Sequence, residues 1–241
     1  MSPVPTSTDG QPLGQRGIRT RQRILEAVAG AIEQQGLRGL RLADVADEVG
    51  ISPPAFYQYF NDLDEAILAL CEEIGGFLPA FSFEDEGLTN GDGHAESTRG
   101  FIARFFEYWD AHRAVLWARN IAVTAGDERF QKVRAETFRP MVAALEAFIE
   151  AGQREGRIDP SISHVSLGAA LTMTLDRMCM LKPQLKEWGT GSSDDLVDAL
   201  AYVFDRALGV GNQGAPRAER GPSTDLGRRW QRKPPWRRTT R

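Results

Sequence analysis

Residues 42–60, LADVADEVGISPPAFYQYF, decide the fold of the N-terminal part of this 241-residue chain. Their first eight residues predict a short helix. Gly50 ends this helix, because glycine readily adopts the left-handed conformation found at helix C-termini. Ser52 is expected to cap a second helix. The first turn of that helix tolerates Pro53 and Pro54, because the N–H groups they lack would find no helical partner there.

Two helices this short are unstable alone, so they must pack against each other and against a neighbour. We expect Val45 and Phe56 to face each other across the pair, with Ile51 filling the space beneath the turn. This arrangement is a helix-turn-helix, which places its second helix in the major groove of DNA. The alternative is an ordinary helical hairpin in which Tyr57 and Tyr59 are core residues.

Helical patterns continue on both sides of this stretch. Upstream, apolar residues recur at helical spacing from Ile24 to Ile32; downstream, Asp62 is a candidate cap for a helix from Leu63 to about Ile74. No segment alternates with a period of two, which predicts an all-α fold. Residues 79–93 predict a loop, and Pro140 is expected to kink or split one of the longer helices that follow it. Those helices are expected at roughly residues 95–112, 114–124, 128–155, 164–181 and 193–208.

Composition excludes several classes of protein. The opening residues have no apolar core typical of a signal peptide, and no apolar run is long enough to span a membrane, so we expect a cytoplasmic protein. Cys71 and Cys179 predict two reduced core thiols rather than a disulfide framework. The net charge of −4 is uneven: residues 212–241 hold nine basic and two acidic residues, or +7, which leaves −11 for the rest. DNA binding by such an acidic body requires a local site.

The segment from about residue 19 to residue 68 resembles the N-terminal domain of the TetR family of transcriptional regulators. The resemblance is carried by Ile24-Leu25, Val45-Ala46, Gly50-Ile51-Ser52, Phe56-Tyr57 and Tyr59-Phe60. It implies a three-helix DNA-binding domain followed by a helical domain that binds a small molecule and forms a dimer. The expected organisation is a disordered segment 1–15, a helix-turn-helix domain 16–62, a ligand-binding and dimerisation domain 63–211, and a basic disordered tail 212–241.

Two positions depart from the family pattern. Arg41 replaces the threonine that usually caps the second helix. Its long charged side chain can reach phosphate, but it does not act as a cap. Leu63 replaces a lysine that anchors phosphate, and the neighbouring Asp62 and Asp64 would repel the DNA backbone. The resemblance therefore predicts weaker phosphate binding at these two helix ends.

The recognition helix offers few side-chain hydrogen bonds to DNA. Pro53, Pro54 and Ala55 lie where the family reads bases, and they suit thymine methyl groups rather than guanine or adenine edges. Gln58 is the nearby amide, while Tyr57 and Tyr59 match phosphate-contacting positions. Four arginines precede the first helix or open it, and they are either an arm that reaches a minor groove or a solvated run of charge. The candidate DNA contacts are Arg16, Arg19, Arg21, Arg23, Arg41, Ser52, Pro53, Pro54, Ala55, Tyr57, Gln58 and Tyr59.

The C-terminal part resembles, more loosely, the ethionamide-resistance repressors of mycobacteria. Residues 105–107 (FFE), residues 112–115 (HRAV) and Asp176-Arg177 carry this resemblance, although Leu175 stands where those repressors have asparagine. An aromatic and methionine-rich set either lines an apolar ligand cavity or fills the core. The candidate ligand contacts are Phe101, Phe105, Phe106, Trp109, Trp117, Asn120, Thr124, Met141, Leu145, Phe148, Leu171, Thr174, Leu175 and Met178.

The last two helices are expected to form a four-helix dimer interface with a second copy, as in the family. Their apolar stripe comprises residues 165–180 together with Leu196, Leu200, Val203, Phe204, Ala207 and Leu208.

Other motifs carry no chemistry. Residues 209–214, GVGNQG, match a dinucleotide-binding string but follow a helix instead of a strand. His94, His112 and His164 have neither metal-ligand nor catalytic spacing, so no enzyme, metal or cofactor is expected.

The sequence therefore predicts a dimeric repressor that a hydrophobic small molecule releases from double-stranded operator DNA. Two alternatives stay open: a DNA-binding activator or architectural protein without a ligand, and a helical protein that binds a partner or a membrane surface through its basic tail.

Overall fold

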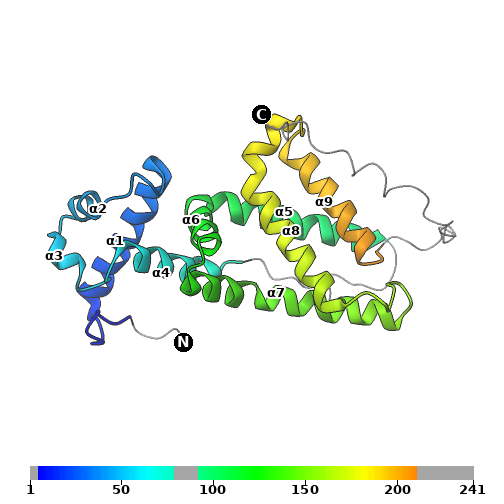
Figure 1. Cartoon of the computed structure of the whole chain (residues 1–241), viewed down its shortest axis with the longest axis horizontal. Coiled ribbons are helices and arrows are strands. Elements are labelled where there is room, and N and C mark those ends of the chain that lie inside the picture. Colours follow the sequence, from blue (N-terminus) through cyan, green and yellow to red (C-terminus); the bar gives the residue numbers. More distant parts are fainter. Residues whose placement is uncertain (1–4, 79–91, 211–241) are drawn as a thin grey trace, which may run out of the picture. The chain divides into compact units, whose positions relative to one another are not determined.

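The computed structural model describes residues 5–78 and 92–210, and these residues form the expected all-α fold (Figure 1). The helices are α1 Gln15–Gln35, α2 Leu42–Val49, α3 Pro53–Phe56, α4 Leu63–Gly75, α5 Asp92–Ala111, α6 Arg113–Thr124, α7 Glu128–Arg154, α8 His164–Leu185, the 3-10 turn η1 Lys186–Trp188, and α9 Ser193–Ala207. None of them is long and apolar enough to cross a bilayer. The expected tail 212–241, and all but the last two residues of the expected loop 79–93, lie outside the described residues.

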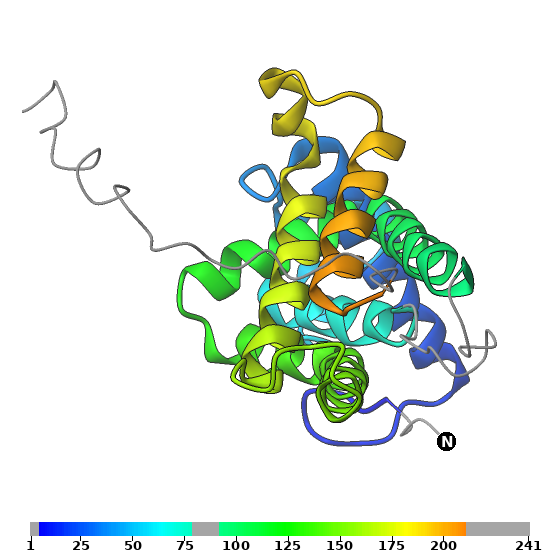
Figure 2. The same cartoon turned by 90° about the vertical axis from the view of Figure 1, so that its right-hand side faces the viewer.

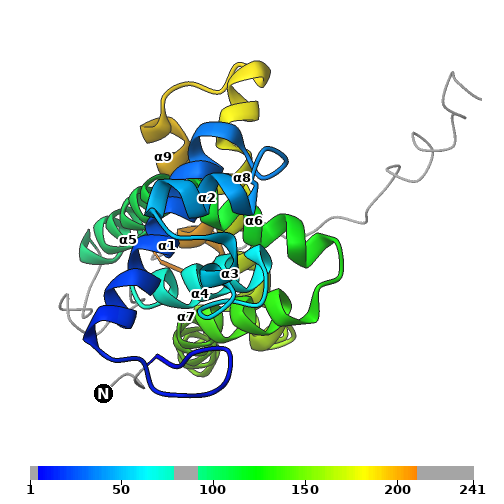
Figure 3. The same ribbon diagram turned by 90° about the vertical axis from the view of Figure 1, so that its left-hand side faces the viewer.

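The first three helices form the predicted helix-turn-helix unit (Figure 3). Gly50 has φ 71° and ψ 39°, the left-handed conformation that ends α2. The N–H of Ile51 then donates to the carbonyl of Ala46 at 3.0 Å, which closes the turn. Val45 and Phe56 are fully buried. The short α2 and α3 are thus stabilised by burial rather than by their own length.

Helix α4 follows a well-formed cap. The side chain of Asp62 accepts a hydrogen bond from the N–H of Glu65 at 2.7 Å, and the Glu65 carboxylate accepts one from the N–H of Asn61 at 2.6 Å. This reciprocal pattern satisfies two N–H groups at the helix start. Helix α4 packs against α1 and also against α6 and α7, so it connects the helix-turn-helix to the rest of the chain.

The remaining helices enclose an aromatic core. Helix α5 packs along α9, and α7 packs along α8. Figure 2 shows α8 and α9 side by side. Phe105, Trp109, Leu145, Leu175 and Phe204 come from four different helices, and each is fully buried.

Pro140 does not split its helix. Helix α7 runs unbroken from Glu128 to Arg154 with Pro140 inside it. Phe138, Met141 and Leu145 are buried on one face of this helix, whereas Pro140 is exposed. Burial of the apolar face outweighs the hydrogen bond that proline cannot make.

Residues 5–14 correct the expectation of a disordered N-terminal segment. They form a turn in which the N–H of Leu13 donates to the carbonyl of Pro5 and the N–H of Ser7 donates to that of Gln11, at 2.9 and 2.8 Å. Thr6 and Pro12 form an isolated β-bridge. Composition alone favoured disorder, but local hydrogen bonds and contacts with the helix-turn-helix order this segment.

Candidate DNA-binding and ligand sites

The recognition element presents a small and weakly polar surface. Ser52, Pro53 and Pro54 are exposed at its start, and the exposed Gln58 follows its end. Ser52 occupies the predicted N-cap position, but its side chain makes no cap hydrogen bond. Its main-chain carbonyl instead accepts from the N–H of Ala55 at 2.9 Å. The Ser52 hydroxyl is therefore not engaged in capping α3.

The two tyrosines differ in their surroundings. Tyr57 is 51% exposed, and its ring meets Phe56 edge-on at 5.9 Å between centroids. Tyr59 is half-buried against the core. Half of the Tyr57 side chain is therefore exposed while its ring contacts Phe56, and phosphate contact by its hydroxyl stays a prediction.

The N-terminal turn binds the end of the recognition element, which the sequence did not predict. The Thr8 hydroxyl donates to the carbonyl of Tyr57 at 2.9 Å, and the Thr8 N–H donates to the carbonyl of Gln58 at 3.1 Å. Helix α3 has only four residues, so carbonyls at its end need partners from outside the helix. No pattern in the sequence links residue 8 to residue 57, because the contact joins segments about 50 residues apart.

The four arginines lie on α1, which begins at Gln15, so they do not form an extended arm. The Arg23 guanidinium donates to the carbonyl of Val49 at the end of α2, and Arg21 lies over the Phe60 ring at 4.9 Å. These two contacts join α1 to the other helices of the unit. Arg16 and Arg19 are exposed on the first turns of α1. DNA contact by these side chains remains a prediction, now from a helix rather than an arm.

Arg41 occupies the N-cap position of α2 and makes no side-chain cap hydrogen bond. Its side chain is exposed. Phosphate contact by this long charged side chain stays a prediction.

Most of the expected ligand-lining residues are part of the packed core. Phe101, Phe105, Phe106, Trp109, Met141, Leu145, Leu171 and Leu175 are buried, and Phe148 and Met178 are half-buried against that core. Thr174 and Thr124, two of the expected polar contacts, are exposed. The Thr124 hydroxyl donates to the carbonyl of Asn120 within its own helix at 2.8 Å. The third polar candidate, Asn120, belongs to a buried charged cluster.

Asp176 is the centre of this cluster, and it is 1% exposed. One carboxylate oxygen accepts from Trp109 Nε1 at 3.0 Å and Arg119 Nη2 at 3.1 Å. The other accepts from Asn120 Nδ2 at 3.3 Å and Arg134 Nη2 at 2.7 Å. The cluster joins α5, α6, α7 and α8 through one carboxylate, and its four donors offset the cost of burying that charge.

Positive charge exceeds negative charge in this cluster, because Arg119 and Arg134 share Asp176. Burial lowers the pKa of Arg119, and Asp176 opposes that change. Burial also raises the pKa of the neighbouring Tyr108 to about 12. The Tyr108 hydroxyl and Arg134 Nε are buried without a hydrogen-bond partner among the described residues. In the sequence, Asp176 was noted only as part of the resemblance to the mycobacterial repressors. The signal that could have predicted a buried charged cluster is an aspartate within an otherwise apolar helix.

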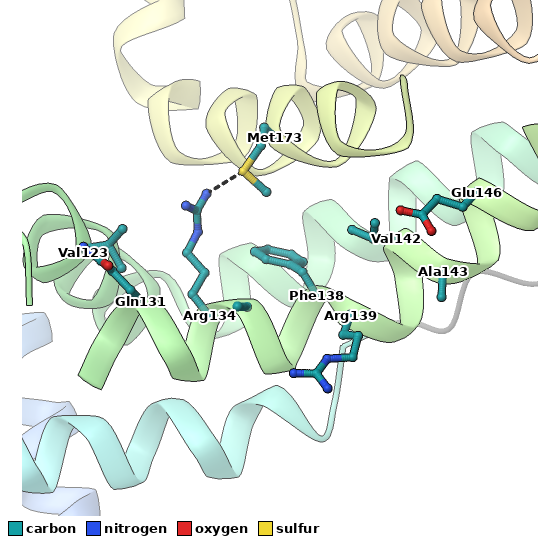
Figure 4. A pocket seen from close by; sticks show the side chains of 10 residues that line it. Val123, Gln131, Arg134, Phe138, Arg139, Val142, Ala143, Glu146 and Met173 are labelled. Atoms are coloured by element: carbon teal, nitrogen blue, oxygen red, sulfur yellow. Dashed lines mark hydrogen bonds between the residues drawn. The ribbon is translucent and has the colours of Figure 1, made fainter. Parts of the chain in front are cut away.

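A groove of about 480 Å³ opens between α7 and α8 above this cluster. Figure 4 shows Arg134 extending from α7 to Met173 on α8, with Phe138 beside it; Arg139 also lines the groove, but its side chain is directed away from Met173. The Phe138 ring forms the buried part of the groove and stacks on Phe105 at 6.3 Å. The Phe138 ring therefore lies between the groove and Phe105, which is one of the predicted ligand contacts. Its lining combines apolar side chains with two arginines, Arg134 and Arg139, and one carboxylate, Glu146.

The last two helices expose part of the expected apolar stripe, and the other part is buried within the chain. Leu196, Leu200, Phe204 and Leu208 are buried within the chain itself, where α9 packs on α5. Val165 on α8 and Tyr202 and Val203 on α9 are instead 49%, 62% and 47% exposed. Val165 and Val203 belong to the expected stripe, whereas Tyr202 lies next to it, and their role in a dimer stays a prediction.

No group of three metal-ligating side chains occurs within residues 5–78 and 92–210. Cys71 and Cys179 are free and buried. Burial raises the pKa of the Cys71 thiol to about 12, and it also raises the pKa of Cys179. Both cysteines therefore have the surroundings of unreactive core thiols.

Two sequence profiles match the chain. Residues 24–70 match the bacterial regulatory proteins of the tetR family, and residues 85–217 match the tetracyclin repressor-like C-terminal domain. The second match covers more than half of the chain. The chain is also 27% identical over 180 residues to the HTH-type transcriptional regulator EthR of Mycolicibacterium smegmatis, across 70% of this chain and 79% of that protein.

Solved structures share the fold. A TetR-family transcriptional regulator from Rhodococcus sp. superposes with a TM-score of 0.54 and 24% identity, covering 79% of this chain and 99% of that one. The regulator FadR of Bacillus subtilis, solved in complex with stearoyl-CoA, gives a TM-score of 0.56 and 16% identity over 79% and 98%. At these identities the structures support the fold rather than a shared ligand.

Proposed function

The chain belongs to the TetR family of DNA-binding transcriptional regulators, and on that premise we propose that it is a dimeric repressor released from its operator by an apolar molecule carrying an acidic group. The observation that carries the proposal is the helix-turn-helix with its exposed recognition surface. The acidic group is our addition to the hydrophobic effector that the sequence suggested, and it rests on the arginines beside the apolar groove.

DNA binding by this protein depends on few polar side chains. Pro53, Pro54 and Ala55 favour contacts with thymine methyl groups, and Gln58 supplies an amide. Tyr57, Arg41, Arg16 and Arg19 are exposed and suit phosphate contacts. Phosphate contacts position the protein without reading sequence, so we expect a modest preference for its operator over other DNA.

Dimerisation supplies the spacing that operator binding needs. Two recognition elements enter successive major grooves when they lie about 34–36 Å apart. Val165, Tyr202 and Val203 form the exposed apolar face on α8 and α9 that we assign to the dimer contact. Burying such a face between two copies is favourable, because apolar surface is removed from water.

The groove between α7 and α8 is the proposed effector site. Phe138, Val142 and Met173 give it apolar walls, and Arg134 and Arg139 are the cations that line it. An acidic end would satisfy the excess positive charge that Arg119 and Arg134 create around Asp176. The stearoyl-CoA complex of FadR supports an acyl effector only by analogy of fold.

Effector binding would reach the DNA-binding unit through α4. Helix α4 packs on α1 and also on α6 and α7, which carry Arg119 and Arg134. A ligand shifts such an equilibrium only by its difference in affinity for the two arrangements. A difference in affinity of at least tenfold, or about 1.4 kcal/mol, is needed for a clear release from DNA.

The test uses the full-length protein and labelled DNA from the region upstream of its own gene. Dodecanoate and dodecanoyl-CoA are expected to lower the DNA affinity at least tenfold, and dodecanol is expected to act more weakly. Arg139→Gln should reduce this preference for acidic compounds without breaking the Asp176 cluster. Arg154→Gln, at the exposed end of the same helix, should leave it unchanged.

Two results would contradict parts of the proposal. DNA binding that no acyl compound alters would favour a ligand-independent regulator. No shift of any DNA fragment by the folded protein would count against operator binding itself.

A further inference from the structure

A second groove, of about 530 Å³, lies between the DNA-binding unit and the helical domain. One side comes from the end of α1 and the loop after it, and the floor comes from α4. The other side comes from the turn between α5 and α6 and from the start of α6. This volume is within the range of small-molecule sites, about 300–1,000 Å³. The groove is separate from the effector groove between α7 and α8, and the two share no lining residue.

The walls of this interdomain groove are largely apolar. Ile32 and Leu37 contribute from the α1 side, Leu70 and Ile74 from α4, and Trp117 from α6. Trp117 is half-buried against the core, so one part of its ring surface remains open. An indole beside aliphatic side chains suits a flat aromatic molecule, and it also attracts a cation placed over its face.

The charged side chains on the α5–α6 turn are paired with one another. Asp110 accepts from Arg113 at 2.8 Å and from Lys182, and Arg113 also donates to the carbonyl of Cys179. Burial lowers the pKa of His112, so this imidazole is mainly neutral at pH 7. It stacks on Phe77 with 6.1 Å between ring centroids.

Glu33 on α1 is the exception to this pairing. It is exposed at the groove and forms no salt bridge within the described part of the chain. A carboxylate without a salt-bridge partner, lining the same groove as a half-buried indole, favours a ligand with a positive charge. An anion at the same place would be repelled by Glu33.

We propose that the interdomain groove binds a compact aromatic molecule with a cationic end, its ring against Trp117 and the aliphatic walls and its charge near Glu33. This site differs from the proposed effector site in its position and in the charge of its ligand. It places a single ligand in contact with α1 of the DNA-binding unit and with α6 of the helical domain.

Occupancy of this groove biases the position of α1 relative to α6. Helix α1 packs on α2, and α6 carries Arg119 of the Asp176 cluster. The ligand therefore acts on DNA binding from the junction rather than from the interior of the helical domain. Linkage requires the operator to change the ligand's affinity by the same factor as the ligand changes the operator's.

Three probes with one ring system test the site by calorimetry in the absence of DNA: 2-naphthylmethylamine, 2-naphthalenemethanol and 2-naphthoate. The amine is expected to bind at least fivefold more tightly than the alcohol, and the naphthoate least tightly. Glu33→Gln should bring the amine to the alcohol's affinity and leave the alcohol unchanged. Glu26→Gln, an exposed carboxylate on the same helix but outside the groove, should change neither.

Equal affinities for the three probes, or an amine affinity that Glu33→Gln leaves unchanged, would overturn the proposed site. Ala29→Phe places a ring in the groove and should abolish amine binding, whereas Ala147→Phe on the exposed side of α7 should not. Because these binding measurements contain no DNA, their failure is distinct from failure of the repressor proposal.

A second set of calorimetric titrations includes the upstream DNA fragment. The amine's affinity should then change at least threefold in the native protein, and Arg139→Gln should leave amine binding as it was. An affinity that DNA does not alter would overturn the regulatory role of the groove.

Discussion

Tyr57 lies at the end of the recognition element with half of its surface exposed and its ring edge against Phe56. Tyr57→Phe retains the ring and removes the hydroxyl. Loss of one hydrogen bond to a charged phosphate should weaken DNA binding by about 1.5–3 kcal/mol, without unfolding the unit. A DNA titration measures the effect, with circular dichroism as a check of folding. Thr137→Val, which removes a hydroxyl that donates to a carbonyl within α7, is the control; equal DNA affinity for both variants would remove Tyr57 from the contacts.

Asp176 is the second position where a single side chain has a large effect. Asp176→Asn leaves Arg119 buried without its counter-charge, and we expect the free energy of unfolding to fall by about 3–5 kcal/mol. Urea denaturation measures this value. Asp198→Asn removes a carboxylate from an ion pair whose side chains are 40% and 60% exposed, for which the expected loss is about 0–1 kcal/mol. Similar losses in the two variants would contradict the central role of Asp176.

The N-terminal turn makes its contribution at the scale of an element. Thr8→Val removes the hydroxyl that donates to Tyr57 and leaves a side chain of similar shape. Because a net hydrogen bond contributes about 0.5–1.5 kcal/mol, DNA binding should weaken by up to about tenfold. Thr137→Val removes a hydroxyl that donates to a carbonyl within α7 and should not affect DNA binding. Full affinity in Thr8→Val would mean that the turn does not position the recognition element.

Elements also differ in how far the sequence predicted them. The bounds of α2 agree with the prediction to the residue. Its end was predictable because Gly50 adopts the left-handed conformation that ends the helix. Helix α7 was expected to be kinked or split at Pro140, yet it is unbroken. The cost of a proline is local and can be read from the sequence, whereas the burial of Phe138 and Met141 that outweighs it depends on which helices α7 meets.

At the scale of the whole molecule, dimerisation through α8 and α9 makes a direct prediction. Val203→Asp places a charge on the exposed apolar face, and it should raise the dimer dissociation constant at least tenfold. Burying an unpaired carboxylate is costly, so the variant should be monomeric in light scattering at low micromolar concentration. Its DNA affinity should fall as well, because two linked recognition elements bind more tightly than one. Ala147→Asp on α7 is the matched control; a Val203→Asp dimer as stable as the native protein would place the interface elsewhere.

The sequence by itself determined the all-α class, the helix-turn-helix and the family, because helical periodicity, a turn glycine and two prolines at a helix start act locally. It also supplied the residue types of the core, although it left open whether they fill a core or line a cavity. Packing resolved much of that choice, since Phe105, Trp109 and Leu175 are fully buried against residues distant in the chain.

Only the tertiary structure decided which polar groups meet. The four donors around Asp176 come from three other helices, and Thr8 binds carbonyls about 50 residues away. The interdomain groove likewise requires α1, α4 and α6 to be placed together before Glu33 and Trp117 can line one space. Such contacts depend on the relative positions of helices, which are set by the sum of many buried side chains and not by the spacing of any single motif.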